Sequence, residues 1–178
     1  TTGAHLPFLA YFGRKNDPHV RAAFAFLIDA MSAGDALNCG RYQHRDCLWG
    51  AIAALNGLVA LPADMRSAQS ERAIKRLANS LLDATYDFAG EHKRWLSFGV
   101  PRGWDLLSAL KALAAHGYAR DARCEPLLKL LLSRQDDQGR WVCGAASLTW
   151  PIEPRNRASK WVTLDALRVL KHHFQFSG

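Results

Sequence analysis

The chain has 178 residues, 49% of them hydrophobic and 22% charged, which is an ordinary composition for one globular domain with a substantial core. Its 23 Lys and Arg residues against 16 Asp and Glu give a net charge of +7, which would suit anionic ligands. The basic residues are scattered without a nucleic-acid-binding motif and no apolar run approaches the roughly 20 residues of a membrane span, so neither a nucleic-acid partner nor a membrane span is predicted.

Amphipathic helices are predicted from apolar residues that recur at helical spacing. Asp17 and Pro18 make an N-cap followed by a first-turn proline, and apolar residues then recur up to Met31. Each predicted helix has one apolar stripe and one polar face, as expected of helices on the outside of a layered fold. Three such amphipathic helices are expected, at about 17–34, 70–82 and 125–135.

Between these helices lie three nearly apolar segments that resemble one another. WGAIAALNGL from Trp49, WDLLSALKAL from Trp104 and WVTLDALRVL from Trp161 superimpose without a gap, at separations of 55 and 57 residues. A helix that is apolar nearly all round is predicted to be buried on most sides. The sequence therefore predicts an all-α protein of repeated helical hairpins, with the amphipathic helices outside and the apolar helices inside. The hairpins are expected at about 17–61, 70–117 and 121–173.

The segment QDDQGRW, residues 135–141, contains a pair of acids that could serve chemistry or structure. It falls where the third outer helix ends and the chain turns toward an inner one. Gln135 can bond the backbone at the helix end, Gly139 permits the turn and Trp141 can pack over it. Asp136 and Asp137 are therefore predicted to be turn and cap residues rather than proton donors.

The spacing Q-x-x-x-G-x-W in this segment resembles the QW motif of terpenoid cyclases. The repeated hairpins resemble the α/α toroid that these cyclases share with protein prenyltransferase β subunits, and SKWVTLDAL resembles the opening of an inner helix in that superfamily. The resemblance extends over essentially the whole chain through the repeats. It implies a toroid-type fold of helical hairpins and an apolar, isoprenoid-like ligand. The D-x-D-D segment that holds the squalene-cyclase acid does not occur in this sequence.

The prenyltransferases that the chain resembles hold zinc with an Asp and a Cys two residues apart and with a His at another helix start. Here Asp46 and Cys47 are adjacent, with His44 two residues before Asp46, and the other inner-helix starts have no histidine. Because zinc requires three or four converging ligands, no metal and no cofactor are predicted. The four cysteines, without CxxC or disulfide-rich spacing, predict reduced thiols in a cytoplasmic protein.

In the toroids that the chain resembles, the starts of the inner helices line the mouth of an apolar funnel. Aromatic side chains there can receive an apolar ligand, and basic groups at the amide ends of helices can receive a phosphate. For each tryptophan the alternative is a packing residue that recurs because the hairpin recurs. The candidate residues are Asp46 and Asp105 for catalysis, and His44, Trp49, Arg102, Trp104, Lys160 and Trp161 for ligand binding.

Two functions from different classes are compatible with this sequence. The first is an enzyme or binder of an isoprenoid or prenyl phosphate, in which Asp46 or Asp105 assists. The second is a non-catalytic helical-repeat scaffold or partner-binding module, which would need neither a cyclase acid nor a zinc site.

The first residues of the chain predict an incomplete ring. Gly13 followed by Asp17 repeats the pattern of Gly117 followed by Asp121, which lies 104 residues later at the end of an inner helix. The chain is therefore expected to begin at the tail of an inner helix and to form part of a toroid. Because an open toroid would leave apolar surface exposed, we expect a protein partner or self-association to complete it.

Overall fold

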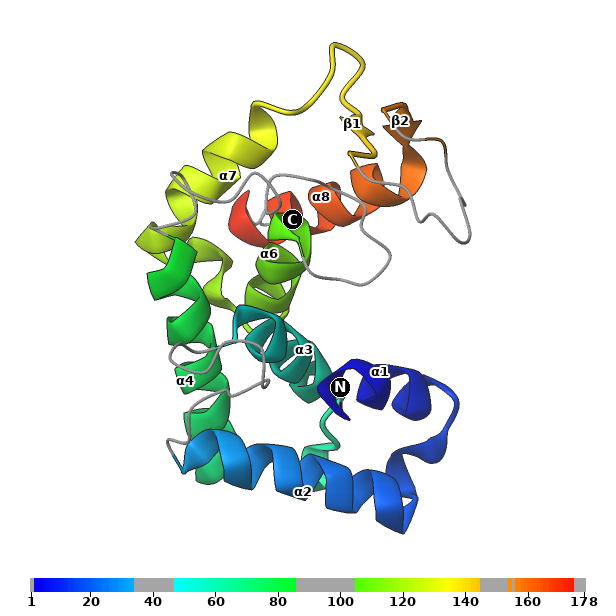
Figure 1. The fold of residues 1–178 in the computed structure, drawn as a ribbon, viewed down its shortest axis with the longest axis vertical. Coiled ribbons are helices and arrows are strands. Elements are labelled where there is room, and N and C mark those ends of the chain that lie inside the picture. Colours follow the sequence, from blue (N-terminus) through cyan, green and yellow to red (C-terminus); the bar gives the residue numbers. More distant parts are fainter. Residues whose placement is uncertain (1, 34–46, 86–104, 145–153, 155, 175–178) are drawn as a thin grey trace. The chain divides into compact units, whose positions relative to one another are not determined.

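The computed structural model describes residues 2–33, 47–85, 105–144, 154 and 156–174, and these residues are predominantly α-helical (Figure 1). The prediction of an all-α protein is confirmed. No helix within these ranges is long and apolar enough to cross a membrane. The α-helices are α1 (Thr2–Tyr11), α2 (Pro18–Ser32), α3 (Leu48–Val59), α4 (Ala68–Thr85), α6 (Leu106–Ala115), α7 (Glu125–Leu132) and α8 (Lys160–Phe174), and the strands are β1 (Trp141–Val142) and β2 (Ala158–Ser159).

The chain divides into two compact units, residues 1–81 and residues 82–178, and each is described by itself. The division into three hairpins and their closure into a toroid stay predictions. The first unit contains α1 to α3 and most of α4, and the second contains α6 to α8 and the short ladder of β1 and β2.

The outer helices form where the apolar spacing predicts them. Asp17 caps α2 by accepting a hydrogen bond from the His19 backbone N–H at 2.9 Å, and the buried face of α2 consists of Val20, Phe24, Leu27 and Ile28. Helix α4 starts two residues before the predicted Ser70. The reason is a reciprocal cap, because the Ser67 N–H donates to Ser70 Oγ at 2.9 Å and the Ser70 N–H donates to Ser67 Oγ at 3.2 Å.

Helices α1 and α3 of the first unit are in backbone contact. A Cβ added to Gly57 would lie 2.7 Å from the Gly3 carbonyl oxygen and 2.9 Å from the Gly3 Cα. A Cβ added to Gly3 would in turn collide with the Ala53 carbonyl oxygen. Small residues thus allow the two helices to approach until their main chains touch, and Leu6 is buried on α1 beside this contact.

The turn that follows α1 has the same geometry as the turn that follows α6. Gly13 has φ 77° and ψ 7°, and Gly117 has φ 84° and ψ 6°, a left-handed conformation that favours glycine. Each glycine opens a short 3-10 turn, Arg14–Asn16 in the first unit and Tyr118–Arg120 in the second. Asp17 ends the first turn at φ −62°, ψ 131°, and Asp121 ends the second at φ −62°, ψ 132°. The sequence match between the two segments therefore corresponds to a repeated local structure.

In the second unit the chain from Lys111 to Ala119 runs alongside α8 in the same direction. Lys111 Nζ lies 2.6 Å from Asp165 Oδ2, and His173 Nδ1 lies 2.8 Å from the Ala119 carbonyl oxygen. Both pairs join residues that are 54 positions apart, so the two segments lie parallel with a constant offset. The first turns of α6 and α8 therefore lie toward the same end of the unit.

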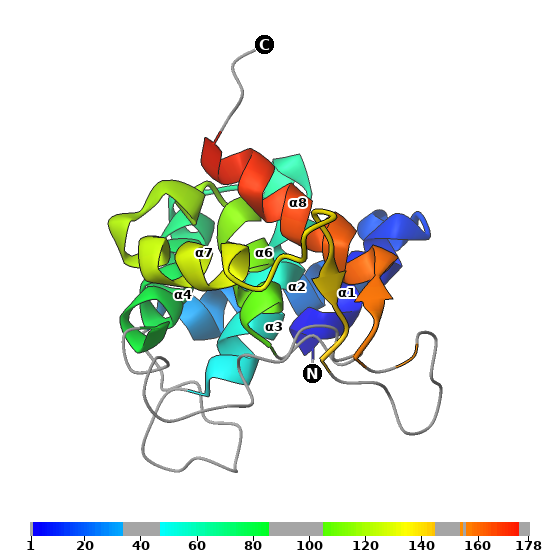
Figure 2. The same cartoon turned by 90° about the horizontal axis from the view of Figure 1, so that it is seen from above.

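The QDDQGRW turn joins α7 to β1, which pairs antiparallel with β2 at the start of α8 (Figure 2). Trp141 is fully buried, and its Nε1 donates to the Leu131 carbonyl oxygen at 2.7 Å. Gly139 adopts φ 75°, as the turn requires. Asp136 accepts hydrogen bonds from the backbone N–H groups of Gln138 and Arg140, so its predicted role in the turn is confirmed. Helix α7 ends at Leu132, three residues before the predicted end, because Gln135 already bridges to Trp141.

Candidate functional site

The predicted site residues are only partly within the structure's described ranges. His44, Asp46, Arg102 and Trp104 lie outside the described residues, so their predicted roles stay predictions. Trp49 lies in the first turn of α3 and is half-buried. Asp105, Lys160 and Trp161 belong to the second unit, where they can be compared with one another.

Asp105 is the N-cap of α6. Its carboxylate oxygen Oδ1 accepts a hydrogen bond from the Ser108 backbone N–H at 2.8 Å, and the residue is only 2% exposed. Ser159 does the same for α8, since its Oγ accepts from the Val162 N–H at 3.0 Å and the residue is buried. Both side chains are engaged in satisfying amide groups at helix starts. This position gives Asp105 a structural role that needs no catalysis.

Lys160 and Trp161 form the pair of predicted ligand-binding residues that the structure brings together. Lys160 Nζ lies 5.7 Å from the centroid of the Trp161 ring, within the range of a cation–π interaction. Trp161 is 56% exposed, so it is not a packing residue of the interior. An ammonium group and an indole ring are thus presented together in the first turn of α8.

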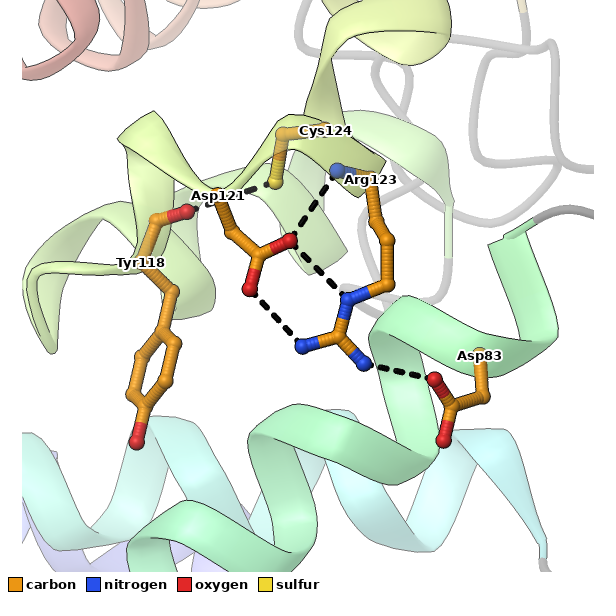
Figure 3. Close-up of polar contacts among 5 residues, drawn as sticks. All are labelled: Asp83, Tyr118, Asp121, Arg123 and Cys124. Carbon is orange, nitrogen blue, oxygen red and sulfur yellow. Dashed lines mark hydrogen bonds and ion pairs between the residues drawn. The ribbon is translucent and has the colours of Figure 1, made fainter.

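A charged cluster that the sequence analysis did not identify lies at the turn before α7. Arg123 Nη1 is 2.6 Å from Asp83 Oδ1 on α4, and Arg123 Nη2 is 2.7 Å from Asp121 Oδ2 (Figure 3). Asp121 Oδ1 also accepts from the Arg123 backbone N–H at 3.0 Å and thereby caps the turn. The available signal was the spacing of Asp121 and Arg123 after Gly117, because an arginine two residues beyond a capping aspartate can fold back onto it.

The electrostatics of this cluster indicate a structural role. Hydrogen bonds from the side chain and backbone of Arg123 lower the pKa of Asp121 to about 2. Hydrogen bonds to Asp121 and Asp83 raise the pKa of Arg123. Burial raises the pKa of Cys124 to about 11, and its Sγ donates to the Tyr118 carbonyl oxygen at 3.4 Å. Both charges are fixed at neutral pH and the thiol stays protonated. The cluster therefore links Asp83, in the last turn of α4, to the turn before α7 and offers no activated nucleophile.

Replacing Arg123 by glutamine is expected to reduce the acid sensitivity of the chain. Because the pKa of Asp121 falls from 3.8 to about 2 on folding, its contribution is complete above pH 3.8 and is lost as the pH falls toward 2. The free energy of unfolding, measured with urea, should therefore fall less steeply over this interval in Arg123→Gln than in the parent. Arg134→Gln, an exposed change after α7, is the control and should follow the parent. Equal slopes for Arg123→Gln and the parent would contradict the assignment.

A comparison of the chain with protein-family models, with curated proteins and with solved structures gives no match. The resemblance to terpenoid cyclases and protein prenyltransferases therefore stays a prediction from the repeats and the Q-x-x-x-G-x-W spacing. Within the described part of the chain, no group of three His, Cys, Asp or Glu side chains is arranged to hold a metal ion.

Proposed function

We propose that the chain is a non-catalytic helical-repeat module that binds a protein partner. The observation that supports this proposal best is the position of Asp105, a candidate catalytic carboxylate that is buried and bonded to the first turn of α6. A general acid must reach a substrate atom, and a capping carboxylate bonded to its own helix is poorly placed to do so. We also propose a cytoplasmic location, in line with four cysteines that have no CxxC and no disulfide-rich spacing.

A second candidate function is the binding of an isoprenoid or prenyl phosphate in a toroid-like fold. It is favoured by Lys160 and Trp161, which lie together in the first turn of α8. A phosphate would gain from the ammonium group and the helix amides, and a hydrocarbon chain would gain from the indole ring. Asp105 would then assist only indirectly, by fixing the start of α6.

Titration with farnesyl diphosphate separates the two functions. For a partner-binding module we expect no saturable change of tryptophan fluorescence up to high micromolar ligand. Saturable quenching that Lys160→Gln and Trp161→Ala both abolish would instead establish prenyl-phosphate binding and overturn the proposal.

The capping role of Asp105 predicts a difference between two variants. Asp105→Asn, which retains the capping oxygen, should have the same free energy of unfolding as the parent, whereas in Asp105→Ala it should be about 1 kcal/mol lower because the cap is missing.

A further inference from the structure

The outward face of α8 is unusually apolar for an exposed helix face. Trp161, Leu164 and Leu167 follow one another at intervals of three residues and are 56%, 39% and 49% exposed. The opposite side of the same helix is buried through Val162, Ala166 and Val169, among other residues. Helix α8 is thus apolar on two sides, and only one of them is covered.

The face of α6 that corresponds to the exposed face of α8 is buried. In the gapless alignment Leu107, Leu110 and Lys111 occupy the positions of Leu164, Leu167 and Arg168. Leu107 and Leu110 are buried, and the aligned residues of α3, Ile52 and Leu55, are buried as well.

The cations at equivalent positions of α6 and α8 also differ in their ion-pair partners. Lys111 of α6 is paired at 2.6 Å with Asp165, which lies on the neighbouring helix α8. Arg168, the equivalent of Lys111, lies 3.4 Å from Asp165 of its own helix and remains exposed. The face of α8 therefore repeats the two leucines and the cation of α6, but its leucines are exposed and its cation has no partner on another helix among the ion pairs of the described second unit.

We propose that this face, formed by Trp161, Leu164, Leu167 and Arg168, docks an amphipathic helix of a partner protein that places a carboxylate against Arg168. This inference rests on the proposed partner-binding function and names its surface and the chemistry of the partner. The partner helix would resemble the buried side of α8, with an acid between small or branched apolar residues, as Asp165 stands between Val162 and Val169. Apolar anchors and one ion pair are the usual elements of such a helix-on-helix contact.

Charge favours a partner of another kind over a second copy of this chain. The face is basic, because Lys160 and Lys171 accompany Arg168 on the exposed side of α8. At the position of Asp165 the other aligned helices have Ser108 in α6 and Ala53 in α3, neither of which is acidic. Helix α1 exposes aromatic residues but contains no acid in its ten residues. A second copy that docked through this same face would therefore place Lys160, Arg168 and Lys171 against the same three cations.

The test uses the full chain and a synthetic helical peptide of about 20 residues, long enough to be helical in water. The peptide repeats the spacing of Val162, Asp165, Ala166 and Val169 on an otherwise Ala, Glu and Gln background, and a second peptide has Lys in place of the Asp. We expect saturable binding of the Asp peptide, measured by calorimetry. Arg168→Glu should weaken it at least ~10-fold, equivalent to about 1.4 kcal/mol, and should reverse the preference in favour of the Lys peptide.

Two further variants complete the design. Leu164→Ser combined with Leu167→Ser should abolish binding, and Arg134→Glu, a charge reversal on the turn after α7, should leave it unchanged. Unaltered helicity by circular dichroism identifies variants that remain folded. Absence of peptide binding, or binding that Arg168→Glu leaves unchanged, would overturn the inference.

Two other occupants of the face would also overturn it. One is a second copy, shown by sedimentation of the chain as a dimer that the double serine variant dissociates. The other is lipid, shown by co-sedimentation with phosphatidylserine vesicles that depends on the same leucines. Failure of the proposed partner-binding function is recognised separately, by saturable binding of farnesyl diphosphate at Lys160 and Trp161.

Discussion

Replacing Trp141 by alanine is expected to lower the free energy of unfolding by about 3–5 kcal/mol, the range for a buried aromatic side chain reduced to a methyl group. Trp141 has no exposed surface and fills the space between the end of α7 and the start of α8. Its Nε1 donates to the Leu131 carbonyl oxygen at 2.7 Å, so the substitution also leaves a carbonyl at the end of α7 without this donor. The loss is measured by urea unfolding followed by circular dichroism.

The two acids of the same turn are expected to contribute less to stability than Trp141. An asparagine at position 136 retains an oxygen that can accept from the Gln138 and Arg140 N–H groups, so Asp136→Asn together with Asp137→Asn should cost far less than Trp141→Ala. Val142→Ala, next to Trp141 but partly exposed, controls for the position in β1. A double asparagine variant that is less stable than Trp141→Ala would show that the acids, rather than the indole, hold this turn.

The fold class and the local turns could be predicted because short-range chemistry determines them. The Asp17 cap, the apolar stripe of α2 and the Gly139 turn each depend on residues within a few positions of one another, and each was predicted correctly. The start of α4 was predicted two residues late, because the partner of Ser70 in the cap is Ser67, a residue outside the apolar pattern.

The candidate site was harder to predict because exposure depends on contacts between distant segments. The alignment treats Trp161, Leu164 and Leu167 as equivalents of residues in other inner helices and therefore suggests burial. In the structure all three are exposed, whereas Val162, Ala166 and Val169 on the opposite side of α8 are buried. For the Arg123 cluster, only the local pair with Asp121 leaves a signal in the sequence, because Asp83 lies 40 residues away on α4.

The contact between α1 and α3 also depends on distant segments. It predicts that replacing a helical glycine by alanine, which ordinarily stabilises a helix, is destabilising here. In an ordinary helix interior, glycine is about 0.5–1 kcal/mol less favourable than alanine, so Gly57→Ala should stabilise α3 by that amount. Here the added Cβ would meet the main chain of Gly3 at 2.7 Å, and a main chain cannot rotate aside as a flexible side chain can. We therefore expect Gly57→Ala to destabilise the chain by about 1–3 kcal/mol, and Gly57→Val by about 3 kcal/mol or more.

Urea unfolding of these two variants and of two others, Val59→Ala and Gly3→Ala, checks this expectation. Val59→Ala changes an exposed residue on the same helix and should stay within about 0.5 kcal/mol of the parent, as surface substitutions usually do. Gly3→Ala should be as harmful as Gly57→Ala, because its Cβ collides with the Ala53 carbonyl oxygen from the other side of the same contact. If Gly57→Ala instead raises the free energy of unfolding, helix propensity outweighs the steric clash, and α1 and α3 must be able to separate without loss.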